Sequence, residues 1–209
     1  MINILIADDH PVVREGIKQI IAKSIDIKVT AEASNGQEVI EKVTMNNFDL
    51  IILDIAMPGR DGFEVIKEIK RVKPNTPILV LSIYPEDQIG IRVLENGASG
   101  YLNKESAPSE LINAITKIYD GRKYISPNLV ETLASRVMIS KKPLLHENLS
   151  NREYQILCLI ASGKDPKEIA DRLSLSIKSV RTYRERIHQK LMVKNDVELT
   201  HYAIQNKII

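Results

Sequence analysis

Short runs of apolar, mostly β-branched residues alternate with helical patterns along the first 120 residues of the chain. Three of these runs are residues 2–7, 50–53 and 78–81. Short apolar runs of this kind are typical of strands that are buried in a parallel sheet. The segments between the runs carry apolar residues at helical spacing, over residues 12–23, 37–45, 62–72, 87–96 and 108–119. Strand and helix alternate five times, which predicts an α/β fold with a doubly wound, five-stranded parallel sheet.

Five polar residues stand where the apolar runs end. Asp8 and Asp9 follow the first run, and Asp54 and Ser82 follow the two later ones. Lys104 follows the last strand pattern. In open α/β sheets, ligands bind outside the carboxyl ends of the strands, near the point where the strand order reverses. A single aspartate after a strand is usually a helix cap or a turn residue, but five polar residues in this order favour a common site.

The residue types indicate phosphoryl transfer. Asp8, Asp9 and Asp54 would place three carboxylates in one cleft, where like charges cost energy unless a cation lies between them. Mg²⁺ suits such a site, because it takes one or two carboxylates and keeps waters for the incoming phosphoryl oxygens. Lys104 would offset the charge of a phosphoryl group on Asp54, and the Ser82 hydroxyl can donate a hydrogen bond to the same oxygens. The expected product is an aspartyl phosphate.

Residues 1 to about 120 resemble the receiver domain of bacterial two-component response regulators. The matching motifs are, in chain order, Asp8-Asp9-His10, Asp54-Ile55-Ala56-Met57-Pro58-Gly59, Ser82, Gly97-Ala98-Ser99-Gly100-Tyr101 and Lys104. The resemblance implies a flavodoxin-like fold and a cognate sensor histidine kinase as partner.

The same resemblance implies a role for each site residue. Asp54 would be the phosphoacceptor. Mg²⁺ would be bound directly by Asp9, Asp54 and the Ala56 carbonyl, and by Asp8 through water. Ser82, Tyr101 and Lys104 would contact the phosphoryl group, with Ser82 and Tyr101 as the switch pair.

Two features depart from the receiver pattern. Glu105 stands after Lys104 where many receivers have proline, so a cis peptide bond is not expected there. Ala56 and Tyr84 occupy positions that resemble the family's modulators of phosphate lifetime. The lifetime of the aspartyl phosphate therefore does not follow from the sequence.

The composition fits a cytoplasmic protein of two domains. A length of 209 residues suits two compact domains with a linker. The single cysteine, Cys158, lies in an apolar helical pattern. Because it has no second cysteine to pair with, an internal disulfide framework is excluded, and a lone thiol suits a reducing compartment. The chain opens without a secretory signal pattern, and no apolar run approaches the length of a membrane span. We therefore expect no membrane partner.

Charge is distributed unequally along the chain, whose net charge is +2. Residues 1–120 hold 13 Lys and Arg against 18 Asp and Glu, a net charge of −5. Residues 121–209 hold 16 against 9, a net charge of +7. Opposite signs indicate different partners, and the basic half suggests a polyanion.

A linker is expected at residues 121–146, in which Leu129, Leu133 and Val137 indicate a short helix. Four short helices are predicted in the domain that follows, residues 147–209.

The first of these helices begins at a capping box of Ser150 and Glu153 and reaches about residue 162. Asp165 and Pro166 begin the second helix, which covers residues 167–173. Ser176 caps the third helix, which extends to Leu191, and the fourth covers about residues 196–205.

The third helix is amphipathic. Its apolar stripe consists of Val180, Tyr183, Ile187 and Leu191, and its opposite face carries Lys178, Arg181, Thr182, Glu185 and Gln189. Six basic residues and one acid lie between Lys178 and Lys194, a density that suits phosphate contacts. An ordinary solvated surface helix is the alternative interpretation.

Residues 147–209 resemble the LuxR-type helix-turn-helix. The matching residues are Leu149-Ser150-Asn151-Arg152-Glu153, Gly163, Glu168-Ile169-Ala170, Leu173, Ser176, Ser179-Val180-Arg181-Thr182-Tyr183 and Lys190-Leu191. A receiver followed by this module is the arrangement of the NarL/FixJ group of transcriptional regulators. The resemblance implies that double-stranded DNA is contacted by Ser176, Lys178, Ser179, Arg181, Thr182, Arg184, Glu185, Gln189 and Lys190.

The resemblance also implies a homodimer on paired half-sites when the receiver is phosphorylated, and RNA polymerase as a further partner. Val197, Tyr202 and Ala203 of the fourth helix are candidate dimer contacts, although packing within the domain competes for them. The module departs from the pattern at Pro166, Tyr183 and Glu185. Because Glu185 can accept a hydrogen bond from cytosine N4, we expect it to read a base.

Three other functions compete with a phosphorylation-gated regulator. A haloacid-dehalogenase-like phosphatase would use Asp54 as nucleophile, but it expects a second acid where Ala56 stands, so we do not expect an enzyme. A receiver-controlled RNA-binding antiterminator would lack the pattern from Ser176 to Leu191. A receiver that dimerises constitutively and ignores phosphate tends to lose a site residue, and all five are present here.

Overall fold

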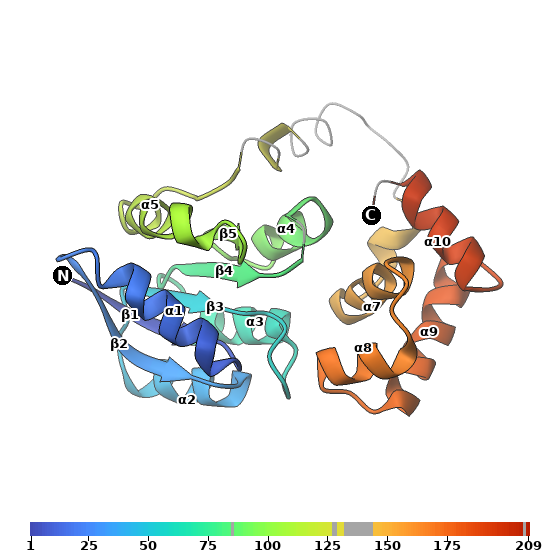
Figure 1. The fold of residues 1–209 in the computed structure, drawn as a ribbon, viewed down its shortest axis with the longest axis horizontal. Helices are drawn as coiled ribbons and strands as arrows, with labels where there is room; N and C mark the ends of the chain where they lie inside the picture. Colours follow the sequence, from blue (N-terminus) through green and yellow to red (C-terminus); the bar gives the residue numbers. More distant parts are fainter. Residues whose placement is uncertain (85, 127–128, 132–143, 207) are drawn as a thin grey trace. The chain divides into compact units, whose positions relative to one another are not determined.

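The computed structural model describes residues 1–84, 86–126, 129–131, 144–206 and 208–209. The chain divides into two compact units, Met1–Glu131 and Thr132–Ile209, and each is described by itself. In Figure 1 the N-terminal part of the chain forms an α/β unit and the C-terminal part forms a helical unit. None of the helices in the described ranges combines the length and the apolar character needed to cross a bilayer.

The first unit is a parallel sheet whose strands alternate with helices. Its elements are β1 Ile2–Ala7, α1 Pro11–Ile21, β2 Ile27–Ala33, α2 Gly36–Met45, β3 Leu50–Leu53, α3 Gly62–Val72, β4 Ile78–Ser82, α4 Glu86–Glu95, β5 Gly100–Asn103 and α5 Ala107–Tyr119. All four strand pairings are parallel, in the order β2-β1-β3-β4-β5. The predicted doubly wound, five-stranded sheet is confirmed, and the predicted helices differ by no more than two residues at either end.

The strand order reverses beside β1. The chain moves from β1 outward to β2, then crosses back to β3 and continues in the other direction to β4 and β5. Because parallel crossovers are right-handed, this reversal puts α1 on the opposite face of the sheet from α2, α3 and α4. Helices α1 and α5 pack together against that first face. The switch point therefore lies between the carboxyl ends of β1 and β3.

The sheet is buried on both faces, as its sequence predicts. Ile4, Leu5 and Ile6 of β1 are fully buried although successive side chains point to opposite faces. One face forms a core cluster with Ile17 and Leu111 from the covering helices. This packing fixes the strand register and hence the positions of the residues that follow the strands.

The second unit consists of short helices that begin at side-chain caps. Its elements are the 3₁₀ helix η1 Leu145–Asn148, α7 Asn151–Ala161, α8 Pro166–Leu173, α9 Ile177–Leu191 and α10 Asp196–Gln205. The predicted capping box of Ser150 and Glu153 is present, and Asp165 forms a second box with Glu168. The Ser176 hydroxyl accepts the Ser179 backbone N–H at the start of α9. The four predicted helices are confirmed.

The segment between the units is partly described. Tyr124 pairs with Gly100 of β5, so the first compact unit extends beyond α5. Leu129, the first residue of the short helix indicated by the sequence, is helical and buried. Leu133 and Val137, on which that prediction also depends, lie outside the described residues.

Candidate functional site

The acidic residues meet at the switch point of the sheet. Ala7 at the end of β1 is in register with Leu53 at the end of β3, so Asp8 and Asp54 leave the sheet side by side. The Asp54 backbone N–H donates to the Ala7 carbonyl over 2.8 Å, which continues the ladder by one residue. Asp8 is 1% exposed and Asp54 is 2% exposed. Both carboxylates are therefore held in a desolvated pocket.

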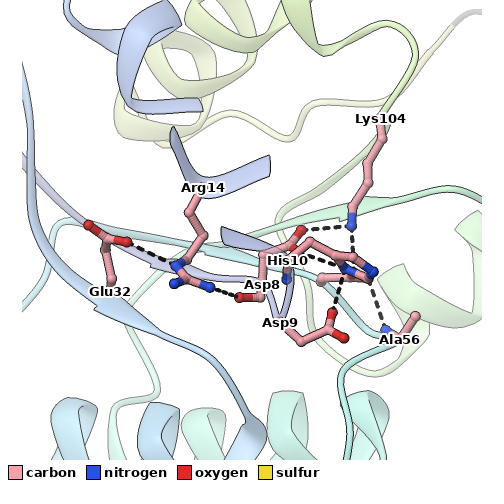
Figure 2. Close-up of polar contacts among 8 residues, drawn as sticks. Asp8, Asp9, His10, Arg14, Glu32, Ala56 and Lys104 are labelled. Atoms are coloured by element: carbon pink, nitrogen blue, oxygen red, sulfur yellow. Dashed lines mark hydrogen bonds and ion pairs between the residues drawn. The ribbon is translucent and has the colours of Figure 1, made fainter. Parts of the chain in front are cut away.

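Lys104, which follows β5, reaches both buried carboxylates, and Figure 2 shows its contact with Asp8. Its ammonium Nζ lies 2.6 Å from Asp54 Oδ2 and 2.7 Å from Asp8 Oδ2. The Lys104 backbone N–H donates to the Ser82 carbonyl at the end of β4, which fixes where the side chain starts. The other carboxylate oxygen of Asp54, Oδ1, accepts the Ala56 backbone N–H over 2.9 Å. Both oxygens of Asp54 thus have a donor.

Burial and charge act in opposite directions on this pair. Burial raises the pKa of Asp54 above its usual value, and Lys104 and the Ala56 N–H offset only part of that effect. For Lys104, burial alone would lower the pKa, but the charges of Asp54 and Asp8 outweigh it and raise the pKa. The neighbouring carboxylates therefore favour the charged ammonium form of Lys104.

Asp9 and His10 form the more open side of the pocket. The Asp9 atom Oδ1 is buried and has no hydrogen-bond partner among the described residues. His10 Nδ1 lies 2.8 Å from it, within ion-pair distance but without hydrogen-bond alignment. Asp8, Asp9, His10 and Asp54 each offer a ligand atom within 4.8 Å of the others, so this cluster is a candidate metal site.

Arg14 of α1 holds the backbone at Asp8 in place through hydrogen bonds. Its Nη1 donates to the Asp8 carbonyl over 2.7 Å, and its Nε donates to Glu32 on β2 over 2.9 Å (Figure 2). The guanidinium thus joins the end of β1 to the neighbouring strand. The contacts of His10 and Arg14 do not follow from the sequence pattern, although His10 stands directly after Asp9.

Ser82 and Tyr101 lie deeper in the sheet, and both are buried. The Tyr101 hydroxyl donates to the Tyr84 carbonyl, and the Ser82 hydroxyl accepts the Tyr84 N–H over 3.4 Å. Burial raises the pKa of Tyr101 far above its usual value, while the Ser82 hydroxyl acts in the opposite direction. Tyr84 therefore links the two residues expected to form a switch pair. Among the described residues, Ser82 makes no hydrogen bond to Asp54.

The predicted DNA-facing surface lies on α9. Val180, Ile187 and Leu191 are buried and Tyr183 is half-buried, as the apolar stripe predicts. The opposite face is exposed along its whole length, at Lys178, Arg181, Thr182, Glu185 and Gln189. The side chains of Lys178 and Arg181 make no hydrogen bond or ion pair to any other described residue.

Two of the nine predicted DNA contacts form ion pairs with residues on other helices. Lys190 Nζ lies 2.6 Å from the buried Glu153 Oε2, and Arg184 Nε lies 2.8 Å from Asp196 Oδ1 on α10. His188 contacts the same Asp196 oxygen at 2.9 Å. These pairs tie α9 to α7 and α10, so Lys190 and Arg184 position the helix in addition to any contact they make with DNA.

The candidate dimer residues of α10 divide into two environments. Val197 is 79% exposed, whereas Ala203 is fully buried. Tyr202 is half-buried, and its hydroxyl lies 3.1 Å from His146 Nδ1 of η1. Ala203 therefore packs within the domain, Tyr202 contacts η1 with its hydroxyl, and Val197 is the most exposed of the three.

Arg152 of α7, one of the residues that match the helix-turn-helix pattern, lies inside the domain. The residue is 8% exposed. The guanidinium donates to the Gln155 Oε1 over 3.0 Å and to the Leu173 carbonyl over 2.8 Å. Because Leu173 ends α8, this hydrogen bond ties α7 to the turn that precedes α9.

Two protein families match the two units. Residues 4–116 match the family described as "Response regulator receiver domain", and residues 147–203 match "Bacterial regulatory proteins, luxR family". The chain is also similar over nearly its whole length to curated proteins. It is 38% identical over 207 residues to the response regulator UvrY of Escherichia coli strain K12, and the alignment covers 99% of this chain and 95% of UvrY. It is 34% identical over 213 residues to the response regulator GacA of Pseudomonas aeruginosa, with coverages of 100% and 98%.

Solved structures show the same similarity. RcsB of Salmonella enterica serovar Typhimurium, bound to the rprA promoter in the presence of the phosphomimetic BeF₃⁻, is 30% identical, with a TM-score of 0.66 and coverages of 97% and 98%. A structure of two RcsB dimers bound to two parallel DNAs is 31% identical, with a TM-score of 0.59 and 96% coverage of each chain. The chain therefore belongs to the two-component response regulators that join a receiver domain to a LuxR-type DNA-binding domain.

Proposed function

We propose that this response regulator accepts a phosphoryl group on Asp54 and, in the phosphorylated state, binds paired half-sites of double-stranded DNA as a homodimer. The donor is a cognate sensor histidine kinase or a small acyl phosphate. The protein acts in the cytoplasm as a regulated phosphoacceptor rather than as an enzyme. Residues 1–120 form the receiver, residues 121–146 the linker and residues 147–209 the DNA-binding domain.

One observation carries the first half of the proposal. Asp54 is a buried carboxylate at the switch point of the sheet, in direct contact with the ammonium of Lys104. A cation at this distance attracts a phosphorylated aspartate more strongly than a free one, because the phosphoryl group adds negative charge. This contact supports a role for Lys104 in stabilising the phosphorylated product.

The residues present fit a bound Mg²⁺. The Asp9 oxygen Oδ1 is buried without a hydrogen bond among the described residues, and Lys104 reaches only the carboxylates of Asp8 and Asp54. A hard divalent cation would satisfy that oxygen. We propose Asp9, Asp54 and the Ala56 carbonyl as direct ligands and Asp8 as a ligand through water. When bound, Mg²⁺ would neutralise phosphoryl oxygens during transfer.

The transfer itself needs only one nucleophile. A carboxylate oxygen of Asp54 attacks phosphorus, the bond from phosphorus to the donor's nitrogen or oxygen breaks, and its electron pair leaves with the donor imidazole or carboxylate. Lys104 then pairs with the new phosphoryl oxygens instead of the Asp54 carboxylate. The Ser82 hydroxyl donates to the same oxygens.

Coupling to the rest of the molecule begins at Ser82. If Ser82 turns toward the phosphoryl group, the Tyr84 N–H loses the acceptor it has in this structure. The Tyr84 carbonyl holds the Tyr101 hydroxyl, so the segment after β4 and the tyrosine respond together. Moving a population from about 1:99 to 99:1 requires roughly 5.5 kcal/mol of differential stabilisation. A smaller coupling gives partial activation and DNA binding before phosphorylation.

The exposed polar face of α9 supports the second half of the proposal. The similarity to RcsB structures that hold DNA supports a DNA-binding role for this chain as well. We propose Ser176, Lys178, Ser179, Arg181, Thr182, Glu185 and Gln189 as direct contacts, with Arg184 and Lys190 also orienting the helix. Val197, together with Ile204, which is 57% exposed on the same helix, is available for the dimer. RNA polymerase is proposed as a partner once the dimer is on a promoter.

Phosphorylation is tested by treating the full chain with acetyl phosphate and Mg²⁺. We expect a mass increase of one phosphoryl group that hydroxylamine removes, as an acyl phosphate requires. Asp54→Asn should abolish the increase, whereas Asp26→Asn, at an exposed aspartate between α1 and β2, should retain it. Full labelling of the Asp54 variant would refute Asp54 as the acceptor.

DNA binding and its control are tested together by selection from a randomised double-stranded pool. Wild type and Asp54→Ala are each incubated with Mg²⁺ and acetyl phosphate before selection. Enrichment of a two-fold-related site that is stronger for wild type would support gating. Equal enrichment by both proteins would favour a regulator with a constitutive receiver dimer, and no enrichment at all would contradict the DNA-binding role.

A further inference from the structure

The imidazole of His10 lies beside the carboxylates of the candidate metal site, and neither helix capping nor core packing explains its position. His10 is the residue before α1, where a side chain would ordinarily accept a backbone N–H, but no such side-chain cap is formed. The side chain is 67% exposed, so it contributes little to the core. Its Nδ1 nevertheless faces the acids, 2.8 Å from Asp9 Oδ1 and 3.4 Å from Asp8 Oδ1.

The distance between His10 and Asp9 fits two ligands of one ion. Octahedral ligands about 2.1 Å from a metal lie about 3 Å from their neighbours in the coordination sphere. The 2.8 Å between Nδ1 and Oδ1 is close to that value, and the two atoms are not aligned for a hydrogen bond. The separation is therefore compatible with both atoms binding one cation.

Charge also favours a cation on this side of the pocket. Lys104 pairs with Asp8 and Asp54, and Arg14 is directed to the Asp8 carbonyl and Glu32. Within the described ranges, neither a lysine nor an arginine pairs with Asp9. Three carboxylates and one ammonium leave a net charge of −2, which a divalent ion neutralises.

We propose that His10 gives this pocket a nitrogen ligand, through Nδ1, so that the pocket also binds borderline first-row ions such as Ni²⁺ and Zn²⁺ in competition with Mg²⁺. The inference rests on the metal site of the proposed function. Imidazole suits Zn²⁺, Ni²⁺ and Cu²⁺, whereas Mg²⁺ prefers oxygen ligands and waters. His10 is thus a selectivity residue whose effect depends on the ion.

Occupancy by such an ion has a functional consequence. An ion held by His10 as well as by Asp9 and Asp54 has fewer open positions for phosphoryl oxygens than one that keeps most of its waters. We expect Ni²⁺ or Zn²⁺ to slow labelling of Asp54 by acetyl phosphate in the presence of Mg²⁺. His10→Ala should relieve that inhibition.

Direct titration of the full chain, without an affinity tag, separates this inference from the proposed function. Calorimetry with NiCl₂ and with MgCl₂ is compared for wild type, His10→Ala and His201→Ala, the last at an exposed histidine of α10. We expect His10→Ala to weaken Ni²⁺ binding at least about tenfold, the scale on which losing one group acts at a metal site, and Mg²⁺ binding no more than about twofold. His201→Ala should change neither affinity at this site.

A spectroscopic measurement distinguishes ligation from mere positioning of Asp9. Pulsed electron paramagnetic resonance of the Cu²⁺-loaded protein should show the modulation of a coordinated imidazole, which His10→Ala should remove and His201→Ala should retain. Equal Ni²⁺ binding by wild type and His10→Ala, or parallel losses of Ni²⁺ and Mg²⁺, would overturn the inference. A His10-dependent Ni²⁺ site in a chain that acetyl phosphate fails to label would support this inference and overturn the proposed function alone.

Discussion

Replacing Arg152 by methionine is expected to loosen the turn between α8 and α9. Arg152 is 8% exposed, and its guanidinium makes two hydrogen bonds, to Gln155 on its own helix and to the carbonyl of Leu173 at the end of α8. Methionine has a similar reach and fills the space, but it donates nothing. The perturbation therefore removes the donors with little loss of apolar packing.

The magnitude follows from those two hydrogen bonds. Each hydrogen bond to a charged group contributes about 1.5–3 kcal/mol. Two effects reduce the sum: methionine avoids the cost of burying a guanidinium, and the Leu173 carbonyl at a helix end can turn toward water. We expect the free energy of unfolding of the second unit to fall by about 2–4 kcal/mol.

Hydrogen exchange measured by mass spectrometry suits a chain of two units, because each helix reports separately. A loss of about 2–4 kcal/mol corresponds to exchange that is about 30-fold to 700-fold faster in peptides from α8 and α9. Peptides from β3 and β4 of the other unit should be unchanged. Arg152→Lys, which keeps the charge and can reach one acceptor, should give an intermediate rate.

Lys167→Met is the matched control, since it removes a positive charge from an exposed position on α8. Surface changes of this kind usually alter stability by no more than about 0.5 kcal/mol. If α8 and α9 of Arg152→Met exchange at the rate of this control, the guanidinium is not what holds the turn, and the reasoning from burial fails. Weaker DNA binding should accompany the loosened turn, because α9 carries the proposed DNA contacts.

Three further perturbations test other contacts. Burial alone would raise the pKa of Glu153, but Lys190 and Ser150 outweigh it and lower the pKa below its ordinary 4.5. The ionised Glu153 therefore stabilises the fold fully above about pH 5, and this contribution is lost as the pH falls below 4.5. Glu153→Gln should remove this contribution and so flatten the pH dependence of the protection of α7 and α9 from exchange. A Cβ at Gly62 would lie 2.4 Å from the Ile55 Cα, so Gly62→Ala should destabilise the first unit by about 1–3 kcal/mol. A Cβ at Gly16 would meet open space, so the control Gly16→Ala should raise the thermal midpoint slightly. Glu185→Ala should change preference at one base position in the selected DNA, and unchanged selectivity across a substituted operator set would contradict base reading by Glu185.

The sequence determined the architecture and the composition of the acidic site. Apolar runs buried on both faces specify a parallel sheet, and such a sheet brings the carboxyl ends of its strands to one edge whatever the details of packing. Asp8, Asp54 and Lys104 could therefore be predicted to meet from their positions after strands. Periodicity also specified the exposed and buried faces of α9, because a helix fixes the direction of each side chain relative to its neighbours.

Only the tertiary structure decided which partner each polar side chain takes. Lys190 and Arg184 lie on a basic helix and read as DNA contacts, yet both form ion pairs with residues on other helices. His10 and Arg14 acquire their roles from the positions of Asp9 and Glu32 across the loop and the neighbouring strand. Periodicity along one element sets a direction, but the distance between two side chains on different elements depends on how those elements pack.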